Sequence, residues 1–440
     1  MHSKRILGIV ALVCGLALAL GGCGAGSGPG NNTGGTVKID FWYSASGVPA
    51  DVLVQQVADF NAQYKDRIEV NAIYQGSYDD SMAKLTTAVQ GGALPGLIQG
   101  GDTYSSYLKD TGLTVSPSEA TDIDGKTFTG EDLVPIIKSY YTFDGTLSSV
   151  PVMVSQPVVV YNPALLKKAG IDPEAAPKSI SELFEVATTI NSKTGVSGIT
   201  QYTNPWWAEQ YTSSSGLLYC SPDNGTGKEP ATAFNYTDPQ QVALWTKVQD
   251  AVKAGVMPNT GTDGNASLNA FTAGKAALMV QSSRIYGDVK KAGTVDFGFW
   301  PLPIGSAEGG AVPGGNSVWI MKEGKSDPEV AAAATLAGYL ASPASQKTIF
   351  EQTGYLPSSQ QALTELVGSV DPRQKVLLDQ FQETKATGAS AGCHTGAMGE
   401  ARTAVNAALE KIIGGADVTS SLQQAQDAGN KAIESYNSRR

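Results

Sequence analysis

The spacing of apolar residues near the start of the chain predicts alternating strands and helices. Every second residue of Val37–Tyr43 is apolar, which predicts a strand with one buried face. The next elements are predicted, in order, as a helix over 53–64, a strand over 69–74, a helix over 79–89 and a short buried strand over 97–99. This β-α-β-α-β order is typical of the α/β class, in which helices cover the faces of a parallel sheet.

The segment 151–162, PVMVSQPVVVYN, predicts a crossing between two sheets. Val158 to Val160 are β-branched and indicate a buried strand. Pro151 and Pro157 flank the polar pair Ser155 and Gln156, and a proline cannot donate to a sheet ladder. A chain of 440 residues is also longer than a single hydrophobic core usually supports. We therefore expect two lobes with a small-molecule cleft between them.

Local signals place the elements of the second half. Ser179 and Glu182 predict a capping box, and Asp238 followed by Pro239 predicts another helix start. The segment 204–236 is aromatic and rich in Gly, Ser and Asn, which predicts a loop rather than core. Further helices are predicted over 164–169, 327–341, 343–352, 362–367, 374–384, 398–413 and 419–436. Further strands are predicted over 276–280, over 297–300 on the way back to the first lobe, and over 317–321 within that lobe.

The N-terminus has the order of an export signal. A short basic head is followed by an apolar run over 6–20 that is too short to span a bilayer. The LGGC sequence at 20–23 resembles the lipobox of a bacterial lipoprotein signal. This resemblance implies a signal peptide over 1–22, a lipidated Cys23 and a flexible tether over 23–36. The alternative is an ordinary signal peptide with a coincidental cysteine.

The charge balance narrows the range of partners. The formal net charge is −10, and removal of the leader with its two basic residues makes it −12. A chain this acidic is a poor partner for nucleic acid or for an anionic lipid surface. Neither is predicted as a partner.

Cysteine and histidine are too scarce for several kinds of chemistry. Export and lipidation leave Cys220 and Cys393, and an exported protein allows a disulfide, so both the bonded and the free forms stay open. His394 is the only histidine after the leader, which excludes a multi-histidine metal site. No GxSxG elbow or GxxxxGK phosphate loop is present. We therefore predict no metal, no cofactor and no enzyme, and keep a hydrolase using paired carboxylates and a purely structural surface lipoprotein as alternative classes.

Five segments occur in an order that resembles a known family. They are FWYSASG at 41–47, YQGSYDD at 74–80, PVVVYN at 157–162, VPGGNSVWIM at 312–321 and TGYLP at 353–357. Over essentially the whole exported chain, the sequence resembles family 1 extracellular solute-binding proteins of ABC importers, the maltose and glycerol-3-phosphate type. Within that family it is most similar to binders of glycerol-3-phosphate and glycerophosphodiesters.

This resemblance implies a two-lobe periplasmic-binding-protein-like fold of type II, with a hinge and an interlobe ligand cleft. By position, the N-terminal lobe would comprise 37–154 and 302–352, and the C-terminal lobe 155–301 and 353–440. The lobes would close on a polar hydroxylated solute. The closed form would deliver it to an ABC permease. The protein would be a monomer anchored through Cys23 to the outer face of the cytoplasmic membrane.

Three of the implied ligand contacts come from the first half of the chain. Tyr78 matches the second tyrosine of the family's YxGxY segment, although an exposed turn tyrosine is the alternative. Asp102 stands where glycerophosphate binders carry an acid for glycerol hydroxyls, and a carboxylate accepts two such bonds. Its alternative is a helix N-cap. Ser155 stands where the family places a serine on phosphate, and its alternative is a hinge residue that caps a turn.

The ligand contacts implied for the following part of the chain are an aromatic wall, serine hydroxyls and a glycine backbone N–H close to the ligand. Trp206 and Trp207 match the wall, and one of the two is expected in the core. Ser282 and Ser283 match a serine pair with a hydroxyl on the ligand. Gly315 matches a glycine whose backbone N–H approaches the ligand closely.

The cationic groups depart from the family pattern. The resemblance places Tyr355, in TGYLP, on phosphate. The phosphate-pairing arginine expected in the loop 392–398 is replaced by His394, which offers no guanidinium fork. Arg284 could supply the missing charge, with a surface salt bridge as the alternative. A weaker cationic site suits a phosphodiester, such as glycerophosphocholine, better than glycerol-3-phosphate. It also suits a neutral mono- or oligosaccharide, which is the alternative ligand.

Overall fold

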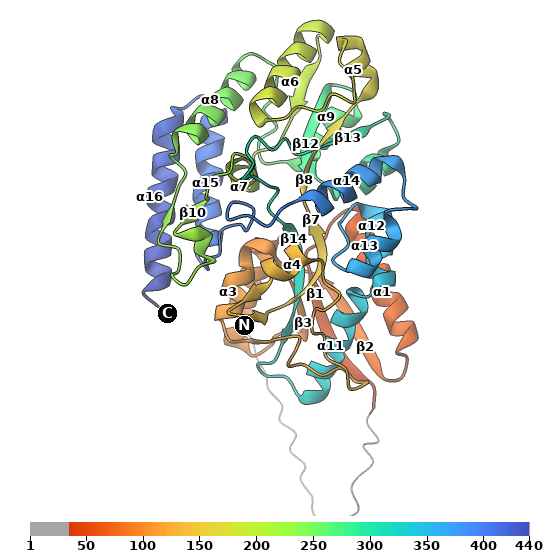
Figure 1. Cartoon of the computed structure of the whole chain (residues 1–440). Helices are drawn as coiled ribbons and strands as arrows, with labels where there is room; N and C mark the ends of the chain where they lie inside the picture. The colour runs from red at the N-terminus through yellow and green to blue at the C-terminus, as the bar shows by residue number, and fades with distance from the viewer. Residues whose placement is uncertain (1–34, 440) are drawn as a thin grey trace, which may run out of the picture. The chain divides into compact units, whose positions relative to one another are not determined.

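The first sheet collects strands from both ends of the sequence. The structure is a computed structural model that describes residues 35–439, and the chain from Thr36 onward forms one compact unit (Figure 1). The strand order is β2-β1-β3-β14-β4, with β7 also paired to β14. Their bounds are Val37–Tyr43 for β1, Ile68–Tyr74 for β2, Leu97–Gly101 for β3, Thr114–Val115 for β4, Val150–Ser155 for β7 and Gly314–Met321 for β14. The strand β1 is parallel to β2 and β3, which confirms the predicted parallel start.

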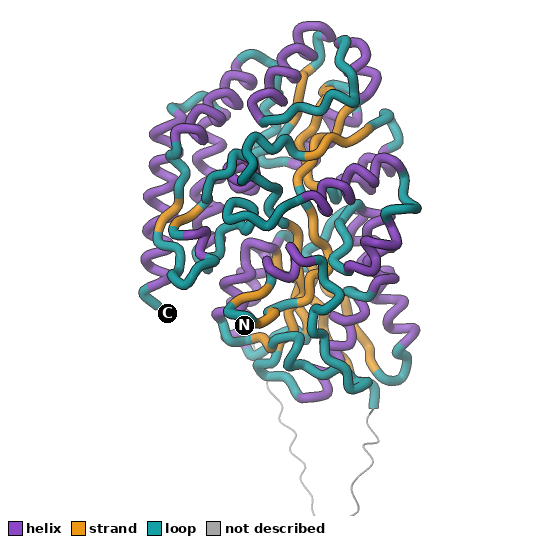
Figure 2. The backbone as a smooth tube through the Cα atoms, in the orientation of Figure 1, coloured by secondary structure: helices purple, strands orange, loops and turns teal. Residues whose placement is uncertain are grey.

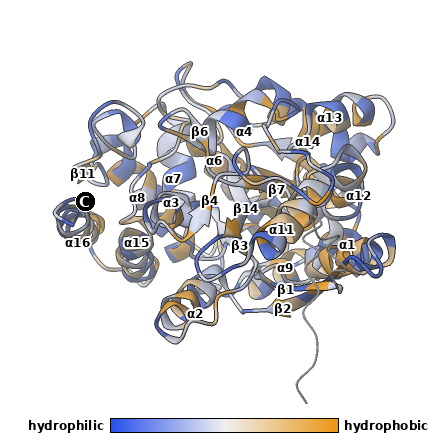
Figure 3. Ribbon diagram, turned by 90° about the horizontal axis from the view of Figure 1, so that it is seen from below, coloured by the Kyte–Doolittle hydropathy of each residue, from blue (hydrophilic) through white to orange (hydrophobic). Residues whose placement is uncertain are grey.

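Helices cover both faces of this sheet. On one face, α1 (Val48–Gln63) and α11 (Asp327–Leu340) pack their apolar sides against Phe41 of β1. On the other, α2 (Tyr78–Gly91) and α3 (Ser105–Asp110) pack against Trp319 of β14. Viewed from below, the helices around the sheet show both hydrophobic and hydrophilic stretches (Figure 3). The two buried layers explain why the inner strands β3, β7 and β14 are almost wholly buried, whereas β1 and β2 alternate buried and exposed residues.

The predicted crossing at 151–162 is confirmed. The strand β7 pairs with β14 in the first sheet, and β8 (Pro157–Tyr161) pairs with β12 (Ala276–Ser282) and β13 (Gly298–Pro301) in the second. Figure 2 shows the two groups of strands meeting at this point. The second sheet runs β13-β8-β12-β9, with β9 at Ser197–Thr200. Because β13 still belongs to this sheet, the predicted return at 297–300 is wrong, and the chain re-enters the first sheet only with β14.

The second sheet is also covered on both faces. Val159 faces α6 (Ile180–Thr194), whereas Val158 and Val160 face a cluster that includes α9, α10 and α14. These helices span Gly264–Thr272, Ile285–Ala292 and Pro372–Glu383. Half of the predicted capping box is wrong. Ser179 caps Glu182 N–H, but the Glu182 carboxylate accepts from the N–H of Lys178.

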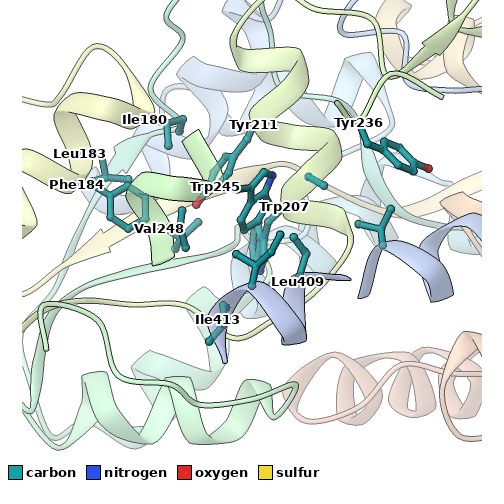
Figure 4. Packing of buried hydrophobic residues seen from close by; sticks show 14 of the residues in the cluster. Ile180, Leu183, Phe184, Trp207, Tyr211, Tyr236, Trp245, Val248, Leu409 and Ile413 are labelled. Atoms are coloured by element: carbon teal, nitrogen blue, oxygen red, sulfur yellow. The ribbon is translucent and has the colours of Figure 1, made fainter. Parts of the chain in front are cut away.

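The prediction that 204–236 is loop rather than core is wrong. The helix α7 (Trp206–Ser214) is almost wholly buried, and Trp207 and Tyr211 lie in the largest hydrophobic cluster (Figure 4). The helices α15 (Met398–Ile413) and α16 (Val418–Asn437) pack over this region. Cys220 and Cys393 form a disulfide with their Cα atoms 5.7 Å apart, which settles the alternative left open by the sequence. Aromatic packing and this disulfide hold the glycine-rich segment in a defined conformation.

Shorter elements complete the described chain. They are η1 Asp102–Tyr104, α4 Pro135–Tyr140, β5 Thr142–Phe143, β6 Thr146–Leu147, α5 Pro163–Ala169, β10 Cys220–Ser221, η2 Asp223–Gly225, β11 Ala233–Phe234, α8 Pro239–Lys253, α12 Pro343–Thr353 and α13 Gln360–Leu366. Within residues 35–439, no helix is long and apolar enough to cross a bilayer. The predicted signal peptide and Cys23 lie outside the described residues.

Candidate functional site

An arginine bonded to two carboxylates joins distant parts of the chain. Arg402, on the second turn of α15, binds Asp102 through Nη2–Oδ2 at 2.8 Å. It also binds Glu209 of α7, through Nε–Oε1 at 2.5 Å and Nη2–Oε2 at 2.8 Å. Its Nη1 donates to Thr103, which follows Asp102 after the end of β3. The side chains of Asp102, Glu209 and Arg402 are only 10%, 5% and 17% exposed. We call these three residues the Arg402 cluster.

Burial and pairing act in opposite directions within the Arg402 cluster. Burial raises the pKa of Glu209, and Arg402 limits that rise. Burial lowers the pKa of Arg402, but the carboxylates of Asp102 and Glu209 outweigh it and leave the pKa well above its ordinary value. The guanidinium is therefore charged at every relevant pH, and it ties the end of β3 to α7 and α15.

Two predicted tyrosines and the predicted arginine lie near one another. The Tyr78 hydroxyl, at the first turn of α2, accepts from Asn316 Nδ2 at 2.8 Å. Burial raises the pKa of Tyr355, while Arg284 and the hydroxyl of Tyr78 lower it. Arg284 pairs with Asp288 one turn along, Nη1–Oδ2, at 3.4 Å, and 30% of its side chain stays exposed. This guanidinium is less tightly held than that of Arg402.

Asp288 also links two helices across the fold. Its Oδ1 accepts from the N–H of Val48 at 3.2 Å, at the start of α1. The N-cap residue Gly47 has no side chain to cap this helix. A carboxylate at a helix N-terminus is stabilised by the exposed N–H groups and by the helix dipole. Asp288 therefore holds α10 against α1 while it orients Arg284.

The two tryptophans have separate environments. Trp207 is fully buried in the core, and its Nε1 donates to the Tyr202 carbonyl at 2.9 Å. Trp206 is partly exposed and packs its ring on Gly314, where a Cβ would lie 2.7 Å from the indole. Its Nε1 is buried and has no hydrogen-bond partner within the described chain. Trp207 is therefore the core member of the pair, and a contact of Trp206 with the ligand stays a prediction.

Ser155 and Gly315 lie at the same strand pairing. Ser155 is buried opposite Gly314, where β7 pairs with β14. Gly315 has φ +99°, and a Cβ there would lie 2.0 Å from the Met153 carbonyl. The backbone of β14 therefore requires glycine at 315 whether or not a ligand is bound. The role predicted for Gly315 on the ligand stays a prediction.

The serine pair lies at the end of β12 beside the TGYLP segment. Ser283 is buried, its N–H donates to the Gln156 carbonyl at 2.8 Å, and Gly354 packs closely on its carbonyl. Its hydroxyl has no hydrogen-bond partner among the described residues. The Ser282 hydroxyl accepts from the N–H of Arg284 at 3.5 Å. Ser283 therefore has a buried hydroxyl that a ligand could satisfy, close to Tyr355 and Arg284.

His394 lies apart from the Arg284 group. Its ring packs on Tyr140 and Phe143, with ring centroids 5.2 and 5.1 Å away, and its Nε2 lies 3.1 Å from the Ala391 carbonyl. Burial lowers its pKa to about 4, so the ring is neutral. It lines a cavity of about 770 Å³ that the other predicted ligand residues do not line.

Sequence reasoning missed the arginine that the fold supplies. The loop 392–398 has His394 where an arginine was expected, but the helix that follows carries Arg402 to Asp102. The buried positions Ala401 and Val405 of α15 show which face of the helix turns inward. The sequence therefore did contain a signal for Arg402. It is an arginine beside the inward face of a helix, and that helix follows a loop that the resemblance assigns to the ligand site.

Comparison with known proteins gives one family and one fold. The description "Bacterial extracellular solute-binding protein" matches residues 55–373. The chain is 27% identical over 409 residues to the sn-glycerol-3-phosphate-binding periplasmic protein UgpB of Rhizobium meliloti, covering 90% of this chain and 94% of that protein. It is likewise 27% identical to the UgpB of Salmonella typhimurium, over 90% of this chain and 93% of that one.

Solved structures share the fold. UgpB from Mycobacterium tuberculosis, solved with glycerophosphocholine, superposes with a TM-score of 0.72 at 22% identity, covering 92% of this chain and all of that chain. The GacH receptor of Streptomyces glaucescens, solved with and without acarbose, gives 0.74 at 21%, covering 91% of this chain and 99% of that one. These matches confirm the two-lobe α/β fold predicted from the sequence. Since the family description spans most of the chain, this protein belongs to the bacterial extracellular solute-binding proteins.

Proposed function

We propose that this protein captures a glycerophosphodiester or glycerol-3-phosphate and delivers it to an ABC permease. The observation that carries the proposal is the gathering of Tyr78, Arg284 and Tyr355 near Asp102 of the Arg402 cluster. A guanidinium with tyrosine hydroxyls suits a phosphate, and a carboxylate suits vicinal hydroxyls. The UgpB relatives, named for sn-glycerol-3-phosphate, support the same ligand class.

The charges suggest which end of the ligand lies where. Arg402 is already bonded to two carboxylates, so a phosphate there would compete with both. Arg284 has one carboxylate partner, at 3.4 Å, and is partly exposed. We place the phosphate at Arg284 with Tyr355 and Ser283, and the glycerol hydroxyls at Asp102. In this arrangement Asp102 keeps Oδ2 on Arg402 and receives a ligand hydroxyl on Oδ1.

Export and anchoring belong to the same proposal. A solute-binding lipoprotein would hold Cys23 in the outer leaflet of the cytoplasmic membrane, with 24–36 as a tether. The two moving bodies would be 37–154 with 302–352, and 155–301 with 353–440. Metabolic labelling with a palmitate analogue tests the anchor, because Cys23→Ala should abolish labelling and release the protein.

Calorimetry with the purified protein tests the ligand class. The panel contains glycerol-3-phosphate, glycerophosphocholine, glycerol, glucose and maltose. We expect the phosphates to bind at least tenfold more tightly than glycerol or the sugars. Tighter binding of maltose than of any phosphate would replace this proposal with the saccharide alternative.

Arg284→Ala tests the phosphate position. The variant should bind glycerophosphocholine and glycerol with similar affinity, because it lacks the positive charge that would bind the phosphate of glycerophosphocholine. Lys290→Ala is the matched control, since it removes a cation from the same helix, packed on the Tyr286 ring rather than at the proposed site. Discrimination retained in Arg284→Ala would remove Arg284 from the site.

A further inference from the structure

Two buried side-chain amides link Tyr78 to the backbone that follows β1. The Oε1 atom of Gln99 accepts from the N–H groups of Ser44 and Ala45, at 2.8 and 3.1 Å. The Nε2 atom of Gln99 donates to Oδ1 of Asn316 at 2.9 Å, and Asn316 Nδ2 donates to the Tyr78 hydroxyl at 2.8 Å. Gln99 and Asn316 are both fully buried. We call Gln99, Asn316 and Tyr78 the donor chain.

The direction of each hydrogen bond in the donor chain is fixed. A backbone N–H can only donate, so the atom of Gln99 that faces Ser44 and Ala45 must be its oxygen. The amide nitrogen of Gln99 then faces Asn316, which must present its own oxygen. Asn316 therefore turns its nitrogen toward the Tyr78 oxygen. Because the Tyr78 oxygen accepts from Asn316, the Tyr78 O–H must point away from Asn316.

The outer end of the donor chain lies at the end of β3. Asn316 pairs with Gly101 of β3, one residue before Asp102. The Tyr78 ring packs on the same glycine, where a Cβ would lie 2.8 Å from two ring carbons. Tyr78 itself is only partly buried. The strand pairing therefore brings the Tyr78 hydroxyl to the place where Asp102, the residue proposed for the glycerol hydroxyls, leaves the sheet.

The TGYLP segment lies beside the same strands. The N–H of Leu356 donates to the Val154 carbonyl at 2.7 Å. Val154 lies opposite Gly315 in the pairing of β7 with β14, and Gly315 directly precedes Asn316. Tyr355, the residue before Leu356, is therefore held next to the strand that carries the donor chain.

A hydrogen bond from Tyr78 to Tyr355 agrees with this placement. Burial raises the pKa of Tyr355, while Arg284 and a hydrogen bond with the Tyr78 hydroxyl lower it. A hydrogen bond lowers the pKa of a phenol when the phenol oxygen is the acceptor. Since the Tyr355 oxygen accepts from Tyr78, the O–H of Tyr355 must also point onward.

We propose that Gln99 and Asn316 are positioning residues that hold the Tyr78 and Tyr355 hydroxyls as donors, so that this end of the site selects a phosphate oxygen. The inference rests on the proposed function and names the property of the ligand that Tyr355 recognises. Phosphate oxygens are strong acceptors, whereas a ligand hydroxyl here would have to find another acceptor for its own proton. The Asp102 carboxylate can only accept, so the two ends of the site have opposite hydrogen-bonding character.

Asn316→Asp reverses the donor chain while each of its hydrogen bonds keeps a partner. The carboxylate would still accept from Gln99, but it would also accept from Tyr78, whose proton would turn away from Tyr355. In calorimetry with glycerol-3-phosphate, we expect this substitution to lower affinity at least tenfold. In a protein that already carries Tyr78→Phe, the same substitution should lower it less than threefold. The added negative charge would repel phosphate in both backgrounds, so equal losses would overturn the proposal.

Asn316→Leu removes the donor without adding a charge. The Tyr78 hydroxyl would then be free to rotate, and we expect at least a fivefold loss of glycerol-3-phosphate affinity that disappears in the Tyr78→Phe background. Asn61→Leu is the matched control, because Asn61 of α1 also donates to and accepts from one strand residue, Val70, at 2.9 and 2.8 Å. It should change affinity less than twofold. An equal loss in Asn61→Leu would assign the effect of Asn316 to the fold and overturn the proposal.

The donor chain can also be detected without a ligand. In the full chain labelled with ¹³C at tyrosine Cζ, NMR reports the hydrogen bonding of each phenol, and the phenylalanine variants assign Tyr78 and Tyr355. Asn316→Asp should move both signals, and Asn61→Leu neither. A Tyr355 signal that does not move in Asn316→Asp would overturn the proposal even if phosphate compounds bind. If both signals move but no phosphate compound binds the wild-type protein, the proposed function fails, and the phosphate selection inferred here fails with it.

Discussion

Removal of Arg402 should destabilise the protein far more than removal of an exposed arginine. Arg402→Ala leaves the carboxylates of Asp102 and Glu209 in place with side chains only 10% and 5% exposed. Each has then lost a charged hydrogen-bond partner without regaining water. Truncating one partner of a buried ion pair costs roughly 3–5 kcal/mol for this reason. We expect the free energy of unfolding to fall by about that amount.

The chain provides a matched control for this substitution. Arg67 pairs with Asp124 at 2.8 Å, the same distance as Arg402 to Asp102, but its side chain is 53% exposed and that of Asp124 is 42% exposed. An exposed ion pair contributes about 0–1 kcal/mol. Urea denaturation followed by circular dichroism should therefore separate Arg402→Ala from Arg67→Ala by about 2 kcal/mol or more.

The pH dependence identifies the buried carboxylate as the cause. Burial raises the pKa of Glu209 in the folded protein. A group with a raised folded pKa contributes stability that is present below its unfolded pKa, about 4.3 for Glu, and is lost as pH rises through the folded pKa. Arg402→Ala removes the charge that limits the rise, so this loss becomes larger and extends to higher pH. The deficit of the variant should be larger at about pH 8 than at about pH 5.

Two results would refute the reasoning. Equal losses in Arg402→Ala and Arg67→Ala would mean that the Arg402 cluster is no more costly to break than a surface pair. A deficit that does not change between mildly acidic and alkaline solution would mean that Glu209 is not the uncompensated charge. The variant Glu209→Gln should itself show a weaker pH dependence than Arg402→Ala.

The other predictions concern the ligand wall, the TGYLP tyrosine and the cross-link. Trp207→Ala should lower stability by about 3–5 kcal/mol, as for other buried tryptophans, whereas Trp206→Ala should mainly lower ligand affinity; unfolding and calorimetry on both variants check this contrast. Tyr355→Phe should weaken glycerophosphate binding about tenfold with little change in melting temperature, and unchanged affinity would remove its hydroxyl from the site. The pair Cys220→Ser and Cys393→Ser, combined, should reduce stability by about 4–5 kcal/mol because the bond closes a loop across 173 positions; an unchanged unfolding midpoint would contradict this.

Elements with a regular apolar period could be predicted from sequence. The strand Val37–Tyr43 and the helix Met398–Ile413 have the bounds that their patterns predict. The crossing at 151–162 was also predicted from the polar pair between two prolines, although Pro151 and Pro157 themselves lie opposite Ser317 and Ser282 in the two sheets. In each case the signal lies within the segment itself.

The burial of the segment 204–236 could not be predicted from its local sequence pattern. Its glycines and serines resemble a surface loop, but tertiary packing buries Trp207 and Tyr211 beneath α15 and α16. The Cys220–Cys393 bond adds a constraint across 173 positions, which no local pattern contains. Composition predicted exposure here, and long-range packing overrode it.

The Arg402 cluster was missed for a related reason. Its members are 300 and 193 positions from Arg402, and nothing in the neighbourhood of Asp102 or Glu209 indicates a partner so distant. Resemblance placed Asp102 at the ligand but assigned the arginine to the preceding loop. Only the fold shows that α15 carries its guanidinium to the end of β3.

The corrected arginine changes the charge count of the proposed site. Arg402 is balanced by Asp102 and Glu209, and Arg284 is balanced by Asp288, so the group carries a formal charge of −1 before any ligand binds. His394 is neutral and adds nothing. A phosphomonoester adds up to two negative charges above its second pKa of about 6, whereas a diester adds one. We therefore expect the proposed site to favour the diester, because each of its two arginines already has a carboxylate partner. The sequence led to the same expectation from the loss of one arginine, and the expectation now rests on two arginines that are both already paired.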